Sequence, residues 1–238
     1  NVLGANTSGI RNIAIGANSL AANVSGSTSV AIGYTALTSD TSTGNHTAVG
    51  NASLSANTTG TDSVAVGAAA LSANTTGSRN IAIGAAALRF TLSASDATAV
   101  GYQSLLNSTG AGNTALGARA GNTVTSGANG TYIGVDSDAS VATVSSSIAL
   151  GNSATATASN QFVVGSSNSA ISDVFIGEGV TDATPAAFTL NSTGGSGIDI
   201  AGAALRIAGG RATGNAAGGA IVLQTSDAGV SGTTLETL

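Results

Sequence analysis

The sequence predicts an all-β protein, a trimeric β-solenoid followed by a Gly-rich stalk of intertwined β-strands. Three observations lead to this fold class. A phrase of aliphatic residue, Ala, aliphatic residue and Gly recurs at nearly constant intervals along most of the chain. Only 3% of residues are aromatic and 7% are charged, so regular backbone pairing must supply much of the order. Towards the C-terminus the phrase gives way to short aliphatic stretches set among glycines.

The repeat is counted from the marker glycine that follows each aliphatic triplet. The marker recurs at a 17-residue interval, with a single 16-residue interval before Gly117, and after Gly151 the spacing shortens to a 14-residue and then a 12-residue interval. A nearly fixed period of this kind is typical of a solenoid, in which each repeat forms one coil and is stable only when neighbouring coils stack on it. The predicted turn glycines are Gly16, Gly33, Gly50, Gly67, Gly84, Gly101, Gly117, Gly134, Gly151, Gly165 and Gly177.

Each unit begins with a short strand, as in the phrase Ile81-Ala82-Ile83. Alternation along a strand puts the two isoleucines on one face and Ala82 on the other. We expect the isoleucines to face the interior of the coil, together with Leu88, which follows the marker by four residues. The marker Gly84 ends the strand with a bend or a positive φ, and the Asn-Thr-Thr-Gly segment that often follows is predicted to be a turn with left-handed Asn and Gly.

The second strand face carries Ala in eight of eleven units. Larger polar residues would serve equally well in water, so a persistent methyl group indicates that another surface approaches closely. We predict that this surface is the same face of a neighbouring copy around a three-fold axis. The alternative is an exposed face that reflects only the high Ala content of the chain. The candidate subunit-interface residues are Ala14, Ala31, Ala48, Ala65, Ala82, Ala99, Ala115 and Ala149.

The spacing divides the chain into three segments. Residues 1–145 form the solenoid of 17-residue repeats, and residues 146–184 form a β-roll with shorter coils. Pro185, the only proline, marks the start of a Gly-rich segment at 185–238, where short aliphatic strands alternate with glycines. Glycine at this density suits backbones that wind closely about one another, so this segment is predicted to be the intertwined trimeric stalk; a flexible linker is the alternative.

Composition excludes several function classes. The net charge of −5 and the absence of Lys argue against a nucleic-acid partner, because phosphate binding needs clustered basic residues. No run of 18 apolar residues is present, so no membrane span is expected. Without cysteine, neither a disulfide nor a thiolate metal site can form. No cofactor or metal is expected.

Three stretches, NIAIGANSL, NHTAVGNASLSANTTG and NTALGARAG, resemble the repeats of bacteriophage tail fibres. The stretch SSIALGNSATATASNQFVVGSSN resembles the heads of trimeric autotransporter adhesins, which share the phrase N-S-[VI]-A-[IVL]-G. Together the likeness covers residues 1–177. Both families are homotrimers built from β-rolls or β-helices, and both serve attachment. The resemblance implies a non-enzymatic, structural fibre segment that acts as a rigid trimeric spacer in host-cell attachment.

The partners implied by the resemblance are two further copies of the chain, a host cell-surface glycan or protein receptor, and the tail baseplate or a neighbouring fibre part. The location implied is extracellular, on a virion tail fibre, with a bacterial cell surface as the alternative if the chain is the head or stalk of an autotransporter. The 17-residue interval is longer than is usual in autotransporter heads and favours the phage fibre. The Gly-rich end resembles fibre stalks that precede a self-cleaving chaperone, but that chaperone uses a Ser–Lys pair and this chain has no Lys.

Few residues are candidates for chemistry. His46, the only histidine, invites comparison with the left-handed β-helical acyltransferases, but those need an aliphatic residue at every sixth position, so a polar surface role is expected. Asp136 and Asp138 are the nearest carboxylate pair for a polysaccharide-cleaving tailspike, and solvated loop charges are the expected alternative. An ice-binding solenoid is a further alternative, although the Thr ladder it needs is interrupted by Ile and Val.

Two sets of surface residues are candidates for ligand contact. Arg89 and Phe90 lie in the segment RFTLSASDA, which replaces the usual Asn-Thr-Thr-Gly loop and is the most irregular loop of the array. This loop is the predicted receptor contact, because functional residues concentrate on loops carried by a rigid scaffold. Tyr34 and Tyr102 each follow a marker glycine and are expected to pack at the rim between coils or subunits, with sugar binding as the alternative.

Overall fold

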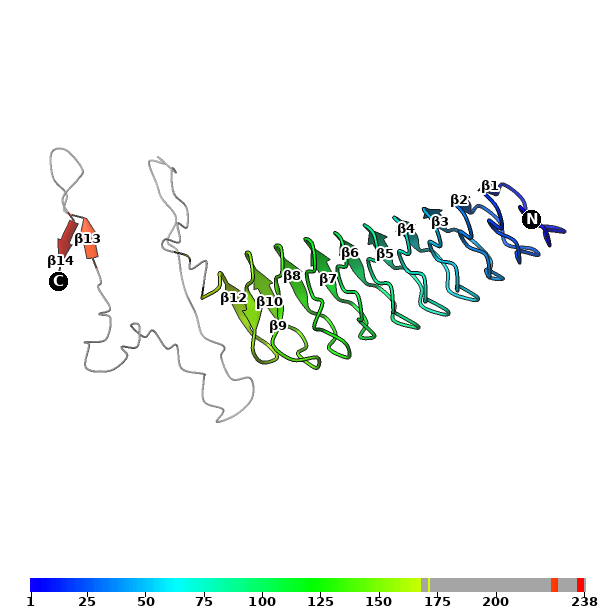
Figure 1. Cartoon of the computed structure of the whole chain (residues 1–238). Coiled ribbons are helices and arrows are strands. Elements are labelled where there is room, and N and C mark those ends of the chain that lie inside the picture. Colours follow the sequence, from blue (N-terminus) through cyan, green and yellow to red (C-terminus); the bar gives the residue numbers. More distant parts are fainter. Residues whose placement is uncertain (168–170, 172–223, 227–234, 238) are drawn as a thin grey trace, which may run out of the picture. The chain divides into compact units, whose positions relative to one another are not determined.

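The computed structural model describes residues 1–167, Ile171, 224–226 and 235–237 (Figure 1). These residues form strands, turns and irregular backbone, with no helix among them. Two compact units are present, residues 1–174 and 175–238. In the second unit the described residues are β13 (Gln224–Ser226) and β14 (Leu235–Thr237), which pair antiparallel. The predicted turn Gly177 and nearly all of the predicted stalk at 185–238 lie outside the described residues.

The first unit is a parallel β-solenoid with 17-residue coils, as the repeat predicts. Its main sheet has ten strands in the order β1-β2-β3-β4-β5-β6-β7-β8-β10-β12, and β9 pairs with β11 in a small second sheet. The strands are β1 (Ile13–Ile15), β2 (Val30–Ile32), β3 (Thr47–Val49), β4 (Val64–Val66), β5 (Ile81–Ile83), β6 (Thr98–Val100), β7 (Thr114–Leu116), β8 (Thr131–Ile133), β9 (Asp138–Ala139), β10 (Ile148–Leu150), β11 (Thr155–Ala156) and β12 (Phe162–Val164).

Backbone hydrogen bonds between successive coils keep the repeats in register. The N–H of Ile81 donates to the carbonyl of Ala97 at 2.8 Å, and the N–H of Leu88 donates to the carbonyl of Ser104 at 3.0 Å. The shortened repeat does not break the stack, because Ile148 of β10 pairs with Phe162 of β12 across a 14-residue interval. The contraction after residue 146 therefore shortens the loops and leaves the sheet continuous.

The assignment of the two strand faces from the sequence is wrong. Ala82 is completely buried inside its own coil, whereas Ile81 and Ile83 are 40% and 41% exposed. The predicted interface alanines Ala31, Ala48, Ala65, Ala82, Ala99, Ala115 and Ala149 are all 0% exposed within a single chain, and Ala14 packs partly buried against the same core. The seven fully buried alanines cannot touch a second copy. The surface that approaches them is the opposite wall of the same coil.

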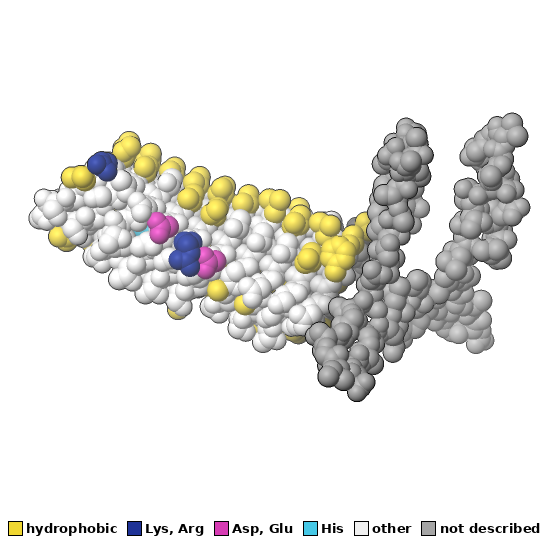
Figure 2. Space-filling model, turned by 180° about the vertical axis from the view of Figure 1, so that it is seen from behind, with side chains coloured by type: hydrophobic (Ala, Val, Ile, Leu, Met, Phe, Trp, Pro, Cys, Tyr) yellow, Lys and Arg dark blue, Asp and Glu magenta, His cyan; other side chains and the backbone are white. Residues whose placement is uncertain are grey.

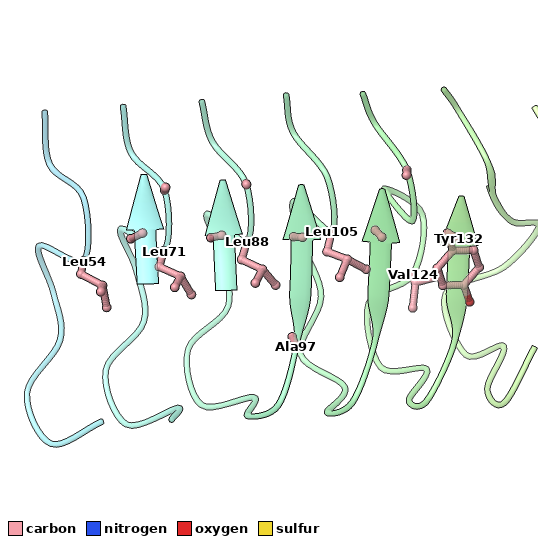
Figure 3. Packing of buried hydrophobic residues seen from close by; sticks show 14 of the residues in the cluster. Leu54, Leu71, Leu88, Ala97, Leu105, Val124 and Tyr132 are labelled. Atoms are coloured by element: carbon pink, nitrogen blue, oxygen red, sulfur yellow. The ribbon is translucent and has the colours of Figure 1, made fainter. Parts of the chain in front are cut away.

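That opposite wall is a column of leucines. The predicted inward position is confirmed for Leu20, Leu37, Leu54, Leu71, Leu88 and Leu105, which are all fully buried. Figure 3 shows four of them directing their side chains towards the strands. Each has a φ between 48° and 51°, in the left-handed region that leucine rarely adopts. The coil is thin, so a leucine from one wall leaves room for only a methyl group on the other.

At one place in the stack the large side chain comes from the strand and the small residue from the opposite wall. Tyr132 occupies an alanine position and is fully buried (Figure 3), and Gly121 replaces the leucine of the opposite wall. A Cβ added to Gly121 would lie 3.1 Å from Cδ2 of Tyr132 and 2.7 Å from Cδ2 of Leu105. Gly130 makes room for the phenol, since a Cβ there would lie 2.5 Å from Oη of Tyr132. Two glycines therefore compensate for one aromatic ring.

The Asn-Thr-Thr-Gly segment differs from the predicted left-handed turn. Asn57 and Gly60 do not have positive φ; instead, the Asn57 side chain is buried and donates to the carbonyl of Gly60 at 3.1 Å and to Oδ1 of Asp40 at 2.8 Å. Asn74 donates to Oδ1 of Asn57 at 3.0 Å, so the asparagines form a buried column along the rod. Gly60 is needed because the carbonyl of Gly77 occupies the place of its Cβ.

Marker glycines do have the predicted conformation. Gly84 has a φ of 129°, and a Cβ there would lie 2.5 Å from the carbonyl oxygen of Gly101 in the next coil. We expect Gly84→Ala to lower the free energy of unfolding by about 2–4 kcal/mol, because strain and a backbone clash act together. Guanidinium denaturation measures this, with Ala85→Ser at the exposed neighbouring position as control. A Gly84→Ala protein as stable as the control would contradict the close stacking.

Substitutions at Tyr132 test whether its ring fills the space opposite Gly121. Its hydroxyl is buried without a hydrogen-bond partner, and burial raises the pKa of Tyr132 to about 12. Tyr132→Phe is expected to raise the free energy of unfolding by about 1 kcal/mol, since it removes an unsatisfied polar group. Tyr132→Ala should lower it by about 3–5 kcal/mol, because the cavity opposite Gly121 stays empty. Equal effects of the two substitutions in thermal unfolding would show that the ring is not packed as described.

Candidate functional site: an exposed apolar stripe

The outer face of the main sheet is an apolar stripe that runs along the rod (Figure 2). We define the stripe as the first and third residues of the ten strands, and none of these residues is charged. The third position is aliphatic in every strand. The stripe comprises Ile13, Ile15, Val30, Ile32, Thr47, Val49, Val64, Val66, Ile81, Ile83, Thr98, Val100, Thr114, Leu116, Thr131, Ile133, Ile148, Leu150, Phe162 and Val164.

The stripe exposes more apolar surface than is usual for a monomer. Its most exposed members are Ile13, Ile15, Ile81, Ile83, Leu116, Ile148, Leu150, Phe162 and Val164, and Phe162 reaches 68%. At on the order of 100 Å² each, these side chains exceed the ~300–600 Å² of the largest patch on a typical monomeric protein. An uncharged, continuous face of this size is the kind of surface that partners cover.

Polar and charged residues line the edge of the stripe two positions before most strands. Arg79 pairs with Asp96 through Nε–Oδ1 and Nη2–Oδ2 distances of 2.6 and 2.9 Å, and Asn45 donates to Oδ1 of Asp62 at 3.1 Å. The hydrogen bond from Arg79 lowers the pKa of Asp96. Figure 2 shows a short run of charged side chains beside the hydrophobic row. An apolar centre with a polar rim is the usual composition of a protein interface.

His46 is buried, so its expected surface position is wrong. The backbone N–H of Ser63 donates to Nδ1 at 3.3 Å, which makes Nε2 the protonated nitrogen, and Nε2 lies 2.9 Å from the carbonyl oxygen of Gly60. Asn80 makes the same two contacts two coils further on, with Ala94 and Ala97. His46 thus replaces an asparagine that links successive coils.

The surroundings of His46 do not form a catalytic triad. Nε2 lies 3.1 Å from Oγ of Ser42 and 3.8 Å from Oδ1 of Asp40, so both would approach the same ring nitrogen. A triad needs the hydroxyl and the carboxylate on opposite nitrogens. All three side chains are also buried, without access for a substrate.

The carboxylates Asp136 and Asp138 are each engaged by other groups. Asp136 pairs with Arg119, whose Nε and Nη2 lie 2.6 and 2.7 Å from its two oxygens, and this hydrogen bonding lowers the pKa of Asp136. Asp138 accepts hydrogen bonds from the backbone N–H groups of Thr123 and Ala139 at 2.8 Å, and burial raises its pKa. Asp136 is a solvated charge as expected, whereas Asp138 is a half-buried structural group.

The predicted receptor residues lie on the surface. Phe90 is 47% exposed, and the Arg89 guanidinium lies over its ring at 5.0 Å from the centroid. Leu92, not singled out from the sequence, is 55% exposed beside them. Tyr34 and Tyr102 are exposed at the position after the marker glycine, along the other edge of the stripe.

Other kinds of site are not seen in the part of the chain that the structure describes. No cluster of three His, Cys, Asp or Glu side chains there is arranged to hold a metal, and no helix there is suited to crossing a membrane. A hollow at the C-terminal end of the rod is lined by Ser153, Thr155, Val163, Val164, Gly165, Ser166, Ser167 and Ile171. None of these side chains titrates near neutral pH.

Comparison with known proteins adds no family. No protein-family model matches the chain, and no curated protein is significantly similar to it in sequence. The resemblance to tail fibres and adhesin heads therefore depends on the repeat phrase alone.

The role of His46 gives a stability prediction. His46→Asn should change the free energy of unfolding by no more than about 0.5 kcal/mol, because the amide makes both hydrogen bonds, as Asn80 does. His46→Ala should lower it by about 1–3 kcal/mol, since the carbonyl of Gly60 and the N–H of Ser63 lose their partner. Urea denaturation of both variants tests this. If His46→Asn lowers the free energy of unfolding as much as His46→Ala does, the imidazole has a further role.

Proposed function

We propose that this chain is a segment of a phage or phage-like tail fibre that acts as a rigid trimeric spacer in host-cell attachment. The observation that carries the proposal is the unbroken ten-strand parallel sheet, which continues along the whole stack of coils. A rod of stacked coils transmits force and separates two ends at a fixed distance. It offers no enclosed, chemically equipped cavity among the described residues.

The apolar stripe supports self-association in place of the alanine face expected from the sequence. Parallel copies have the same spacing between strands, so aliphatic side chains of one rod can pack between those of the next along the whole length. Burial of a half-exposed Ile contributes about 1 kcal/mol, so the stripe favours assembly over a solvated monomer. Three narrow stripes meeting at an axis would cover one another and leave the charged edges in water.

A bacterial trimeric autotransporter head is the second candidate. The 14-residue coil between β10 and β12 favours it, because the resemblance to adhesin heads is carried by this shortened region. Identifying the product encoded beside this chain distinguishes the two, since a baseplate component indicates a phage and an outer-membrane anchor indicates an autotransporter.

Oligomeric state tests the proposal. We expect multi-angle light scattering to give three times the chain mass, and Ile83→Asp with Leu150→Asp to give a monomer that keeps its β circular dichroism, because charge is costly at a buried apolar interface. Thr76→Asp, at an exposed position away from the strands, is the control and should remain assembled. A monomeric wild-type chain would overturn the spacer proposal, and a dimer would overturn the three-fold arrangement.

A further inference from the structure

The turn at residues 89–92 carries large side chains that the fold does not require. Its backbone follows the same hydrogen-bond pattern as the other coils: the carbonyl of Arg89 accepts from the N–H of Ala73 at 3.0 Å, and the N–H of Phe90 donates to Leu106 at 2.9 Å. The preceding coil forms the same turn with Ser72, Ala73 and Thr75. Nothing in the packing therefore explains an exposed Phe and an exposed Leu here.

Arg89 has no carboxylate partner in the described part of the chain. Arg11 also lacks one, whereas Arg79 and Arg119 are each held by a carboxylate. Arg89 differs from Arg11 in lying against an aromatic ring. Its guanidinium lies against Phe90 and keeps hydrogen-bond donors free. In a chain of net charge −5, an unpaired, preorganised cation attracts an anionic ligand.

We propose that Arg89, Phe90 and Leu92 form a binding site for an acidic sugar. A carboxylate matches the bidentate donor geometry of guanidinium, and the C–H face of a pyranose packs on an aromatic or aliphatic side chain. Asn107 follows Phe90 in the next coil and is exposed, so its amide is available to a sugar hydroxyl. Three neighbouring side chains in one turn match the size of one saccharide ring better than that of an extended peptide.

This inference depends on the proposed role in attachment, because it assigns the receptor chemistry of the rod. It is separate from the apolar stripe, which lies on the strands and not on this turn. Assembly and sugar binding can therefore fail independently.

The test is a titration of the whole chain with 3′-sialyllactose and with trigalacturonate. Changes in NMR chemical shifts report binding, and lactose is the neutral control. R89S/F90A/L92T gives the turn the side chains of the preceding coil and should weaken acidic-sugar binding by about tenfold or more without changing the oligomeric state. Adding S72R/A73F/T75L to that variant moves the site by one coil and should restore binding. High salt should weaken binding, as expected for a charge contact.

Several results would overturn the proposal. These are the absence of binding to both acidic saccharides, equal binding of lactose, or unchanged binding after R89S/F90A/L92T. Binding of an acidic peptide, such as a Glu-rich hexamer, without binding of the sugars would also overturn it and assign the turn to a protein receptor. Light scattering on the same samples reports on the spacer proposal separately.

Discussion

Backbone hydrogen bonds between equivalent positions of successive coils are the interaction on which the rest of the rod depends. They fix the height of each coil, so equivalent positions lie above one another: marker glycine against marker glycine, and alanine against alanine in most strands. A residue that does not fit therefore meets a neighbour in the coil on either side, as Tyr132 does between Ala115 and Ala149. This explains why the units share the marker glycine and differ from one another at the exposed turns.

The thin cross-section is the second constraint, and it follows from the first. Two walls this close can accommodate one leucine and one methyl group, or one tyrosine and one glycine, but not two large side chains. The leucines hold left-handed φ values that cost energy in isolation, and they persist because packing on both sides leaves no other place for the side chain. His46 and Asn57 are polar side chains inside this thin coil, and they are accommodated there because they form hydrogen bonds with backbone groups.

The repeat, the parallel stacking, the turn glycines and the inward leucines could be predicted from the sequence, since all are consequences of spacing. The sequence could not predict which face of Ile81-Ala82-Ile83 points inward. Alternation shows that a strand has two faces but does not show which of them is buried. The persistent alanine correctly indicated a close surface, but that surface belongs to the same coil, and the usual preference for burying isoleucine failed because Leu88 already fills the space. The burial of His46 could not be predicted because its neighbours in the sequence are polar. The repeat spacing does place His46 at the position that Asn12 and Asn80 occupy in other units. The 17-residue spacing aligns Leu92 with Thr75, but the exposure of Leu92 could not be predicted, because an apolar side chain in a turn can also pack inward.

The reversal of faces changes what the exposed surface is for. Had the isoleucines been inside, the alanines would have formed the outer face, and the predicted interface between copies would have consisted of methyl groups. With the alanines and the leucines inside, the chain instead directs the isoleucines and valines of its strands outward along the sheet, where they add little to the packing of a single coil. Their presence in every strand, without a charge among them, supports the proposal that other copies of the chain cover this face. The turn at Arg89 and Phe90 is a separate feature. Its exposed Phe90 and Leu92 lie beside a cation without a carboxylate partner and away from the strands, so the proposed sugar site and the proposed assembly face do not share residues.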